Sequence, residues 1–465
     1  MKAPVAIVGG GIAGLSAAAA LRRSSIPFKL YEGGSKLGGL AASYRDPEGY
    51  AHDFGAHFIT NRLAAAVGIG ASCYNVRRYG ESVVVGRRRV ADPFGLMTVP
   101  AYAASALAGR MRGKGVAPKS AADFFRARYG EALAREIAEP IVEAWSGVPA
   151  TELAPSVGEG MPSSILRTIA LKTIDRFGLS RAATAIGYCS SQPESPYVWH
   201  VYPKRGVDTV CRALARDVGD AIALESRVET IYVENERVVG LRVNGRDVDA
   251  SAVVTSAPLP IVASQIVGST QLEAARDLRF RGMILVNLFL RGRGLLGDVV
   301  LWTPTPAHPI FRLTEAPVAM PSLAPDGRTI ITVDIGAAVD DAWWSLDEDA
   351  LAARALATLE HVVPDAAARH LGHRVLRTPI GYPVYHRAYE PTRQRFAERL
   401  PIAGLANVGR NGEFRHLLME DIYWRTIAKM REVVRAWHDA SNVRTARTID
   451  AVTDDAPPRG IAAAT

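Results

Sequence analysis

Cysteine is scarce in this sequence, and its spacing excludes several classes of site. Only Cys73, Cys189 and Cys211 occur among 465 residues, with no Cys-x-x-Cys pair and no histidine at metal-ligand spacing. The pattern argues against a disulfide framework, a zinc site or an iron–sulfur cluster, and we expect no bound metal. Buried apolar thiols are the simplest interpretation. Covalent attachment of a cofactor through one of them stays open without positive support.

Long apolar runs are also missing. The longest candidate after the N-terminus, residues 252–267, contains Pro258 and Pro260 and is too short to cross a bilayer. We therefore expect no integral membrane insertion and a cytoplasmic location. With 48% hydrophobic and 22% charged residues, the composition is that of an ordinary globular protein. The length predicts two or three structural units.

Basic residues are in modest excess, but they lack the context of a nucleic-acid surface. The net charge of +8 comes from 55 basic and 47 acidic residues. The clusters Arg87–Arg89 and Arg110–Lys119 have no interleaved aromatic residues and belong to no known binding motif. We expect a solvated basic face and no nucleic-acid partner. A positively charged cleft for an anionic substrate is the functional alternative.

What the sequence does contain is a dinucleotide-binding pattern at its N-terminus. An apolar run, Val5–Val8, precedes a glycine-rich turn, an alanine-rich helical stretch and a strand-like segment that ends at Glu32. Gly9 allows the tight turn, Gly11 lets backbone N–H groups approach a pyrophosphate, and Gly14 lets the helix pack closely on the strand. Glu32 follows Gly14 by 18 residues, an interval suited to a ribose contact. A secretory signal would need neither the spaced glycines nor the acid, and a turn without a ligand is the remaining alternative.

A second glycine pair, Gly38-Gly39, follows the acid. This arrangement resembles the flavoprotein superfamily that contains amine oxidases, protoporphyrinogen oxidase, phytoene desaturases and UDP-galactopyranose mutase. The segments 124–147 and 403–421 resemble the mutase-like branch most closely. The resemblance implies non-covalently bound FAD and an α/β fold, in which a Rossmann-like (GR2-type) FAD-binding domain is combined with a discontinuous mixed-sheet plus helical substrate domain.

The resemblance and the local patterns together predict the domain organisation. We expect an FAD-binding domain at 1–62, 198–262 and 397–438, a helical substrate domain at 63–197, a mixed-sheet substrate domain at 263–396, and a disordered tail at 439–465. Apolar alternation predicts strands at 283–291 and 329–335, and helical spacing predicts a helix at 346–362. Asn244-Gly245 predicts a hairpin turn.

The resemblance also implies site residues. Those implied for FAD are Gly9, Gly11, Ile12, Ala13, Gly14, Glu32, Gly38, Gly39, Leu40, Val228, Gly409, Arg410, Met419 and Glu420. Among them, Val228 matches a position whose backbone contacts adenine in relatives. A helix starting near Met419 would direct its positive end at the flavin and stabilise the anionic reduced ring. The candidate catalytic residues are His57, Arg312, Tyr385 and Arg410.

Three functions are compatible with these residues. The first is oxidation of a small organic, possibly anionic, substrate by hydride transfer to flavin N5. The second is a redox-neutral nucleotide-sugar mutase, in which reduced flavin N5 acts as a nucleophile. For the mutase, Arg312 and Arg410 match two arginines that bind the diphosphate, and Trp145 matches a residue near the uracil. The third is a non-catalytic flavin-bound module.

The sequence departs from the mutase pattern at several positions, and these departures favour flavin redox chemistry over the mutase function. Where the mutases have a second histidine in the flavin loop, this chain has Ile59-Thr60. Their tyrosine and acid after the Gly-Arg motif correspond here to His416 and Leu418. A diphosphate sugar would then have fewer contacts. The substrate, the electron acceptor and the oligomeric state are left open by the sequence.

Overall fold

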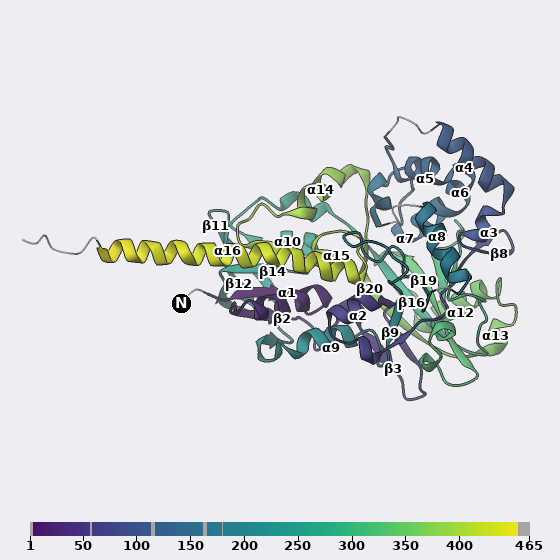
Figure 1. Ribbon diagram of the computed structural model, residues 1–465, viewed down its shortest axis with the longest axis horizontal. Coiled ribbons are helices and arrows are strands. Elements are labelled where there is room, and N and C mark those ends of the chain that lie inside the picture. Colours follow the sequence, from purple (N-terminus) through teal and green to yellow (C-terminus); the bar gives the residue numbers. More distant parts are fainter. Residues whose placement is uncertain (1–2, 56–57, 113–116, 161–164, 179, 454–465) are drawn as a thin grey trace, which may run out of the picture.

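The computed structural model describes residues 3–453, apart from 56–57, 113–116, 161–164 and 179. Figure 1 shows an elongated molecule with an α/β unit at one end and a cluster of helices beside a large sheet at the other. The last helix, α16, extends beyond the α/β unit.

A five-stranded parallel sheet forms the centre of the α/β unit. Its order is β10 (Ile222–Ala223), β2 (Phe28–Tyr31), β1 (Val5–Val8), β14 (Ala252–Thr255) and β21 (Leu405–Asn407). Successive β1 side chains point to opposite faces. Val5 and Ile7 pack in the core that contains α1, α9 and α16, and Ala6 and Val8 pack in the core that contains β11 and β12. Both faces are therefore covered, which explains why β1 is apolar at every position.

An antiparallel meander covers the second face of that sheet. It comprises β11 (Val228–Glu234), β12 (Arg237–Val243) and β13 (Arg246–Asp249), with β15 (Ile266–Val267) at its edge. Asn244 and Gly245 connect β12 to β13 with φ angles of 48° and 73°. These positive values suit a two-residue hairpin turn of the Asn-Gly type. The hairpin prediction is confirmed.

A seven-stranded mixed sheet forms the second unit. Its order is β20 (His370–Pro383), β16 (Phe280–Arg291), β19 (Arg328–Ala337), β18 (Ile310–Thr314), β17 (Val300–Trp302), β7 (Glu81–Val85) and β8 (Arg88–Ala91). Ile284 and Val286 of β16 pack on α12 (Glu348–Leu359). Met283 and Leu285 line a cavity on the opposite face. The strands expected at 283–291 and 329–335 and the helix expected at 346–362 are confirmed.

The helices complete both units. Those beside the α/β sheet are α1 (Ile12–Arg23), α2 (Asn61–Ala66), α9 (Thr209–Arg216), α10 (Leu259–Gln265), α14 (Glu390–Glu398), α15 (Gly409–Gly412) and α16 (Met419–Thr453). Those beside the seven-stranded sheet are α3 (Phe94–Met97), α4 (Pro100–Arg112), α5 (Ala121–Tyr129), α6 (Glu131–Leu133), α7 (Glu139–Ser146), α8 (Ile165–Arg176), α11 (Ala316–Ala319), α12 (Glu348–Leu359) and α13 (Ala366–Arg369). Two small sheets pair β3 (Ser43–Arg45) with β4 (Ala51–Asp53), and β9 (His200–Pro203) with β5 (Ile59–Thr60) and β6 (Cys73–Asn75).

Two parts of the expected layout need correction. The segment 63–197 is not purely helical, because β7 and β8 extend the seven-stranded sheet and β7 pairs with β17, more than 200 residues away. The expected boundaries near 62, 262, 397 and 438 fall inside α2, α10, α14 and α16. The division of the chain into domains stays a prediction.

The C-terminal expectation is also wrong in part. The helix α16 continues to Thr453, through the first part of the segment 439–465 that was expected to be disordered. No glycine or proline occurs between Met419 and Pro457, so nothing in this segment breaks a helix. Residues 454–465, the remainder of the expected disordered tail, lie outside the described part of the chain.

Candidate active site

The first glycine-rich turn forms an open cradle at the start of α1. Gly9 has φ of 102°, and a Cβ on Gly14 would lie 1.9 Å from the Gly9 carbonyl oxygen, so both positions need glycine. A Cβ on Gly11 would meet only the Gly38 oxygen, at 3.8 Å. The first hydrogen bond from the helix joins Leu15 N–H to Gly11 O at 3.0 Å. The N–H groups before it, including those of Ile12 and Ala13, therefore face the cradle as donors for an anion.

The second glycine pair closes the cradle from the other side. Gly38 and Gly39 have φ angles of 120° and 53°, and Gly38 forms a parallel bridge with Gly11. The Gly38 N–H donates to the Gly10 carbonyl at 3.0 Å. Leu40 follows and lines the large cavity described below. The cradle thus leads directly toward the cavity.

Glu32 stabilises the turn itself. Its Oε2 accepts a hydrogen bond from Gly10 N–H at 2.6 Å, and its Oε1 accepts one from Gly34 N–H at 2.7 Å. A carboxylate oxygen has two lone pairs, so Glu32 can still accept a hydrogen bond from a ribose hydroxyl. The ribose contact stays a prediction. The adenine contact of Val228 also stays a prediction, with its carbonyl accepting from Gln265 Nε2 at 2.8 Å.

The C-terminal motif is fixed by buried charges. Gly409 has φ of 78°, and its N–H donates to Glu413 Oε1 at 3.2 Å. Glu413 is fully buried and is held by Arg425 at 2.7 Å and Lys429 at 3.5 Å. This network fixes the turn that precedes Met419, where α16 begins.

The side chain of Glu420 contacts other protein groups, and its expected contact with FAD stays a prediction. Its buried carboxylate accepts hydrogen bonds from Thr60 Oγ1 at 2.8 Å and Trp424 Nε1 at 3.2 Å, and it forms an ion pair with Arg62. Its side chain is therefore committed to protein contacts. The backbone N–H groups at the start of α16, those of Met419 and Glu420, stay predicted contacts for the cofactor.

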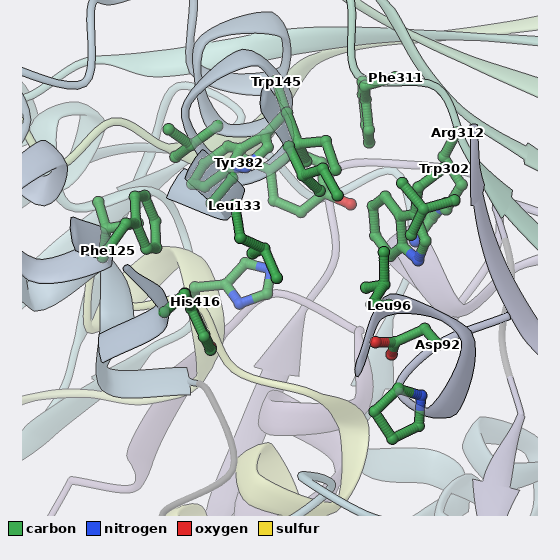
Figure 2. A pocket seen from close by; sticks show the side chains of 18 of the residues that line it. Asp92, Leu96, Phe125, Leu133, Trp145, Trp302, Phe311, Arg312, Tyr382 and His416 are labelled. Atoms are coloured by element: carbon green, nitrogen blue, oxygen red, sulfur yellow. The ribbon is translucent and has the colours of Figure 1, made fainter. Parts of the chain in front are cut away.

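A cavity of about 870 Å³ lies between the helical cluster and the seven-stranded sheet. Most of its wall is aliphatic or aromatic, including Leu96, Phe125, Leu133 and Phe311 (Figure 2). Its charged and polar side chains include Asp92, Arg128, Trp145, Arg312, Tyr382, Arg410 and His416. Leu40, Phe54 and Gly55 line its end nearest the glycine cradle.

Arg410 is a half-buried cation that lines this cavity. Its Cζ lies 4.8 Å from the centre of the Tyr382 ring. Its Nε has no hydrogen-bond partner, and no carboxylate forms an ion pair with it among the described residues. Burial lowers the pKa of Arg410, and the nearby charge of Arg312 lowers it further. An anion in the cavity would supply the missing partner.

Arg312 also lines the cavity, but its charge is neutralised. It forms a hydrogen-bonded ion pair with the buried Asp334 on the neighbouring strand and lies 5.6 Å from the Trp302 ring. Burial opposes its charge, yet Asp334 more than compensates, so its pKa is raised. Glu315, three residues further along the chain, does not pair with Arg312; it accepts hydrogen bonds from Gly294 N–H at 2.7 Å and Thr329 Oγ1 at 2.9 Å.

Three rings cluster next to Arg410. The ring of His416 lies 5.3 Å from that of Tyr382 and 6.0 Å from that of Trp145. Figure 2 shows Tyr382 and His416 on the same side of the cavity. Burial lowers the pKa of His416 to about 3, and Arg410 and Arg312 contribute to the decrease. His416 is therefore a neutral hydrogen-bonding group near pH 7 and a poor general base.

We expect His416 to remain uncharged from about pH 5 to pH 9. Protonation would place a third positive charge beside two arginines in an apolar wall, which burial opposes. Histidine ring resonances in NMR spectra, assigned with a His416→Gln variant, would measure this. A His416 signal that titrates near pH 6.5 would contradict the neutral assignment.

The two remaining catalytic candidates are Tyr385 and His57. Tyr385 is buried behind the wall and does not line the cavity. Its hydroxyl accepts the backbone N–H of His416 at 2.7 Å, and Arg393 lies 4.2 Å from its ring. Tyr385 thus supports the backbone of His416 from behind the cavity wall, and a catalytic role for it stays untested. His57 lies outside the described residues, although its neighbour Gly55 lines the cavity.

Several cavity residues were not found from the sequence. Asp92, Arg128 and Trp302 all line the cavity. Asp92 directly follows the short strand β8. Because the segment 63–197 was predicted to be helical, this strand was not expected. The sequence signal that could have identified Asp92 is a single acidic residue within the otherwise apolar segment 90–97.

The described residues also bear on disulfides, membrane spans and metal sites. Cys73, Cys189 and Cys211 are all free, and Cys73 is only half-buried. Within the same residues, no helix has the length and apolar character needed to cross a bilayer, and no group of three potential ligands could hold a metal.

Together, the Rossmann-like cradle and the neighbouring apolar cavity define a class of flavin-dependent oxidoreductases. Residues 7–65 match the family profile of the NAD(P)-binding Rossmann-like domain. Residues 92–408, more than half of the chain, match that of the flavin containing amine oxidoreductases. The chain belongs to this family and is a flavin enzyme.

Solved structures confirm the fold at low sequence identity. A reduced UDP-galactopyranose mutase is 16% identical, with a TM-score of 0.75 and 94% of each chain covered. A putative protoporphyrinogen oxidase from Exiguobacterium sp. 255-15 is 16% identical, with a TM-score of 0.70, covering 94% of this chain and 99% of that one. Cyclohexylamine oxidase from Brevibacterium oxydans IH-35A is 16% identical, with a TM-score of 0.69, covering 94% and 100%.

Proposed function

We propose that this enzyme binds FAD non-covalently and oxidises a largely apolar substrate that has an anionic group. The observation that supports this best is Arg410, a half-buried cation without an acidic partner among the described residues, in the wall of a largely apolar cavity. The cavity reaches Leu40 and Gly55, next to the glycine cradle. An apolar substrate with one carboxylate would match both the wall and the charge.

The residues of the cradle fit a dinucleotide. The position of Gly11 is open to an approaching ligand, and the start of α1 offers unpaired N–H donors to a pyrophosphate. Non-covalent binding is supported by the thiols, because burial raises the pKa of Cys73 to about 11 and that of Cys211 to about 12. Such thiols are poor nucleophiles, and none lines the cavity.

When bound, FAD would supply the hydride acceptor for the oxidation. The chain's own residues would do the rest. Arg410 would bind the anionic group and fix the orientation of the substrate. The apolar wall would exclude water, which strengthens that contact. Neutral His416 would offer a hydrogen bond without adding charge.

A nucleotide-sugar mutase is the second candidate, because Arg312 and Arg410 both line the cavity. Two points count against it. Asp334 already neutralises Arg312, which leaves one uncompensated arginine for a diphosphate. The remaining wall is mostly apolar, whereas a sugar and a diphosphate need many polar contacts.

One set of experiments separates these functions. Purified protein is expected to be yellow and to release FAD on heating. Under anaerobic conditions, an apolar carboxylate-bearing amine or alcohol that is a substrate should bleach the flavin. The dithionite-reduced enzyme, incubated with UDP-galactopyranose, should give no isomer. A colourless protein that cannot be reconstituted with FAD would reject the proposal. Isomer formation by the reduced enzyme, together with no bleaching of the oxidised enzyme by any of the amines or alcohols, would favour the mutase.

A further inference from the structure

Asp92 lines the cavity but takes no part in the FAD contacts or the anion site proposed above. It follows β8 directly, and its N–H donates to the Glu81 carbonyl at 2.9 Å. Figure 2 shows its carboxylate beside Leu96, on the side of the cavity that also contains Trp302. Among the residues that the structure places, none forms a hydrogen bond or ion pair with this carboxylate. A carboxylate is thus exposed to an apolar cavity without a partner.

The charges around Asp92 do not neutralise it. Burial raises the pKa of Asp92 to about 6, Glu81 of β7 raises it further, and Lys172 of α8 opposes the rise without forming an ion pair. Glu81 itself accepts a hydrogen bond from Trp302 Nε1 at 3.1 Å. Tyr129 of α5 also faces Asp92. Above about pH 6 the carboxylate is therefore charged and in need of a counter-charge.

The sheet separates Asp92 from Arg312. Arg312 is opposite Trp302, Trp302 is opposite Val83, and Val83 is opposite Val90 of β8. Three strand spacings separate β18 from β8, a distance of about 14 Å. Asp92 lies just beyond Val90. Along the sheet, Arg312 and Asp92 are therefore well separated, and Arg128 of α5 is a further cation of the cavity wall.

We propose that Asp92 binds a cationic group of the substrate, such as a protonated amine. The substrate is then an elongated, largely apolar molecule with an anionic group at Arg410 and a cationic group at Asp92. A cation is favoured over a neutral donor because hydrogen bonds between opposite charges are the stronger ones in an apolar environment. This inference rests on the proposed function because it concerns the same cavity.

The test compares two ligands that differ only in the cationic group. FAD-loaded protein is titrated by calorimetry at pH 7.5 with octanoate and with 8-aminooctanoate. Wild type is expected to bind 8-aminooctanoate at least about tenfold more tightly. Asp92→Asn should remove this preference and leave octanoate affinity unchanged. Glu131→Gln, which removes a carboxylate paired with Arg126 at 3.4 Å outside the cavity, should keep the preference.

Thermal unfolding provides a second readout that a structural role would not give. Because the folded-state pKa of Asp92 is raised, the native protein binds more protons than the unfolded chain between about pH 4 and pH 6, and the charged carboxylate lowers stability above that range. Asp92→Asn should therefore unfold at a higher temperature than wild type at pH 8, with the difference vanishing near pH 4. A variant that is less stable at every pH would indicate a structural residue and overturn the proposal.

The outcomes distinguish this inference from the proposed function. An unchanged preference for 8-aminooctanoate in Asp92→Asn would overturn the role of Asp92, as would equal binding of both ligands, or binding of neither, in wild type. A protein that contains no FAD but retains the Asp92-dependent preference would reject the oxidoreductase proposal and leave the cation site in place.

Discussion

Replacing Gly11 with valine is expected to abolish FAD binding while leaving the fold intact. A Cβ at this position meets no protein atom closer than the Gly38 oxygen at 3.8 Å, and the φ of −80° is accessible to any residue. The Cβ of the new side chain would therefore enter the space that we assign to the pyrophosphate. Loss of two charge-assisted hydrogen bonds is worth about 3 kcal/mol or more, a decrease in FAD affinity of at least about a hundredfold. Fluorescence titration of the apoprotein with FAD would measure it.

Two other glycines provide matched controls for Gly11→Val. Gly14→Val places a Cβ 1.9 Å from the Gly9 oxygen and should destabilise the protein itself. Gly33→Ala meets nothing within 4 Å and should behave as wild type. The apoprotein of Gly11→Val should unfold at the wild-type temperature. If Gly11→Val binds FAD normally, the cradle is not the pyrophosphate site.

Arg410→Met should have the second-largest effect, on the binding of anionic ligands. Truncating one partner of a buried charge pair costs about 2 kcal/mol or more, so octanoate affinity of the FAD-loaded protein should fall at least about thirtyfold. The variant should not be less stable without ligand, because the lost cation has no acidic partner among the described residues. Calorimetry and thermal unfolding would measure the two effects.

Arg312→Met is the matched control for Arg410→Met. It would leave the fully buried Asp334 without its counter-charge, and removal of one member of such a pair costs about 3–5 kcal/mol of stability. The two arginines should therefore respond in opposite ways, one in ligand affinity and the other in folding. Unchanged octanoate affinity in Arg410→Met, or an equal loss of stability in both variants, would reject Arg410 as the anion site.

The nucleotide unit could be predicted from the sequence because its signals are local. The run Val5–Val8, the spaced glycines and Glu32 lie within one strand–helix–strand unit. Each of them is required by backbone geometry or contacts within that unit. The hairpin at Asn244-Gly245 was predictable for the same reason. The second glycine pair was informative because it had to meet the first turn, as the bridge between Gly11 and Gly38 shows.

The cavity could be predicted only in part, because its wall is assembled from distant segments. The strand β7 is short, and its partner β17 lies more than 200 residues further along the chain, so no local pattern placed Asp92 beside Trp302. Motif positions alone could not tell that Arg312 is neutralised while Arg410 is not. Tyr385 was expected in the pocket for its motif, but its hydroxyl supports the backbone of His416 from behind.

The central claim is that a flavin dinucleotide in the glycine cradle faces an apolar cavity with one anion-binding arginine. A crystal structure of the protein grown with FAD and octanoate tests it most directly. The account predicts a pyrophosphate at the N–H groups of Ile12 and Ala13 and the octanoate carboxylate within hydrogen-bonding distance of Arg410. An empty cradle, or octanoate bound with its carboxylate away from Arg410, would contradict it.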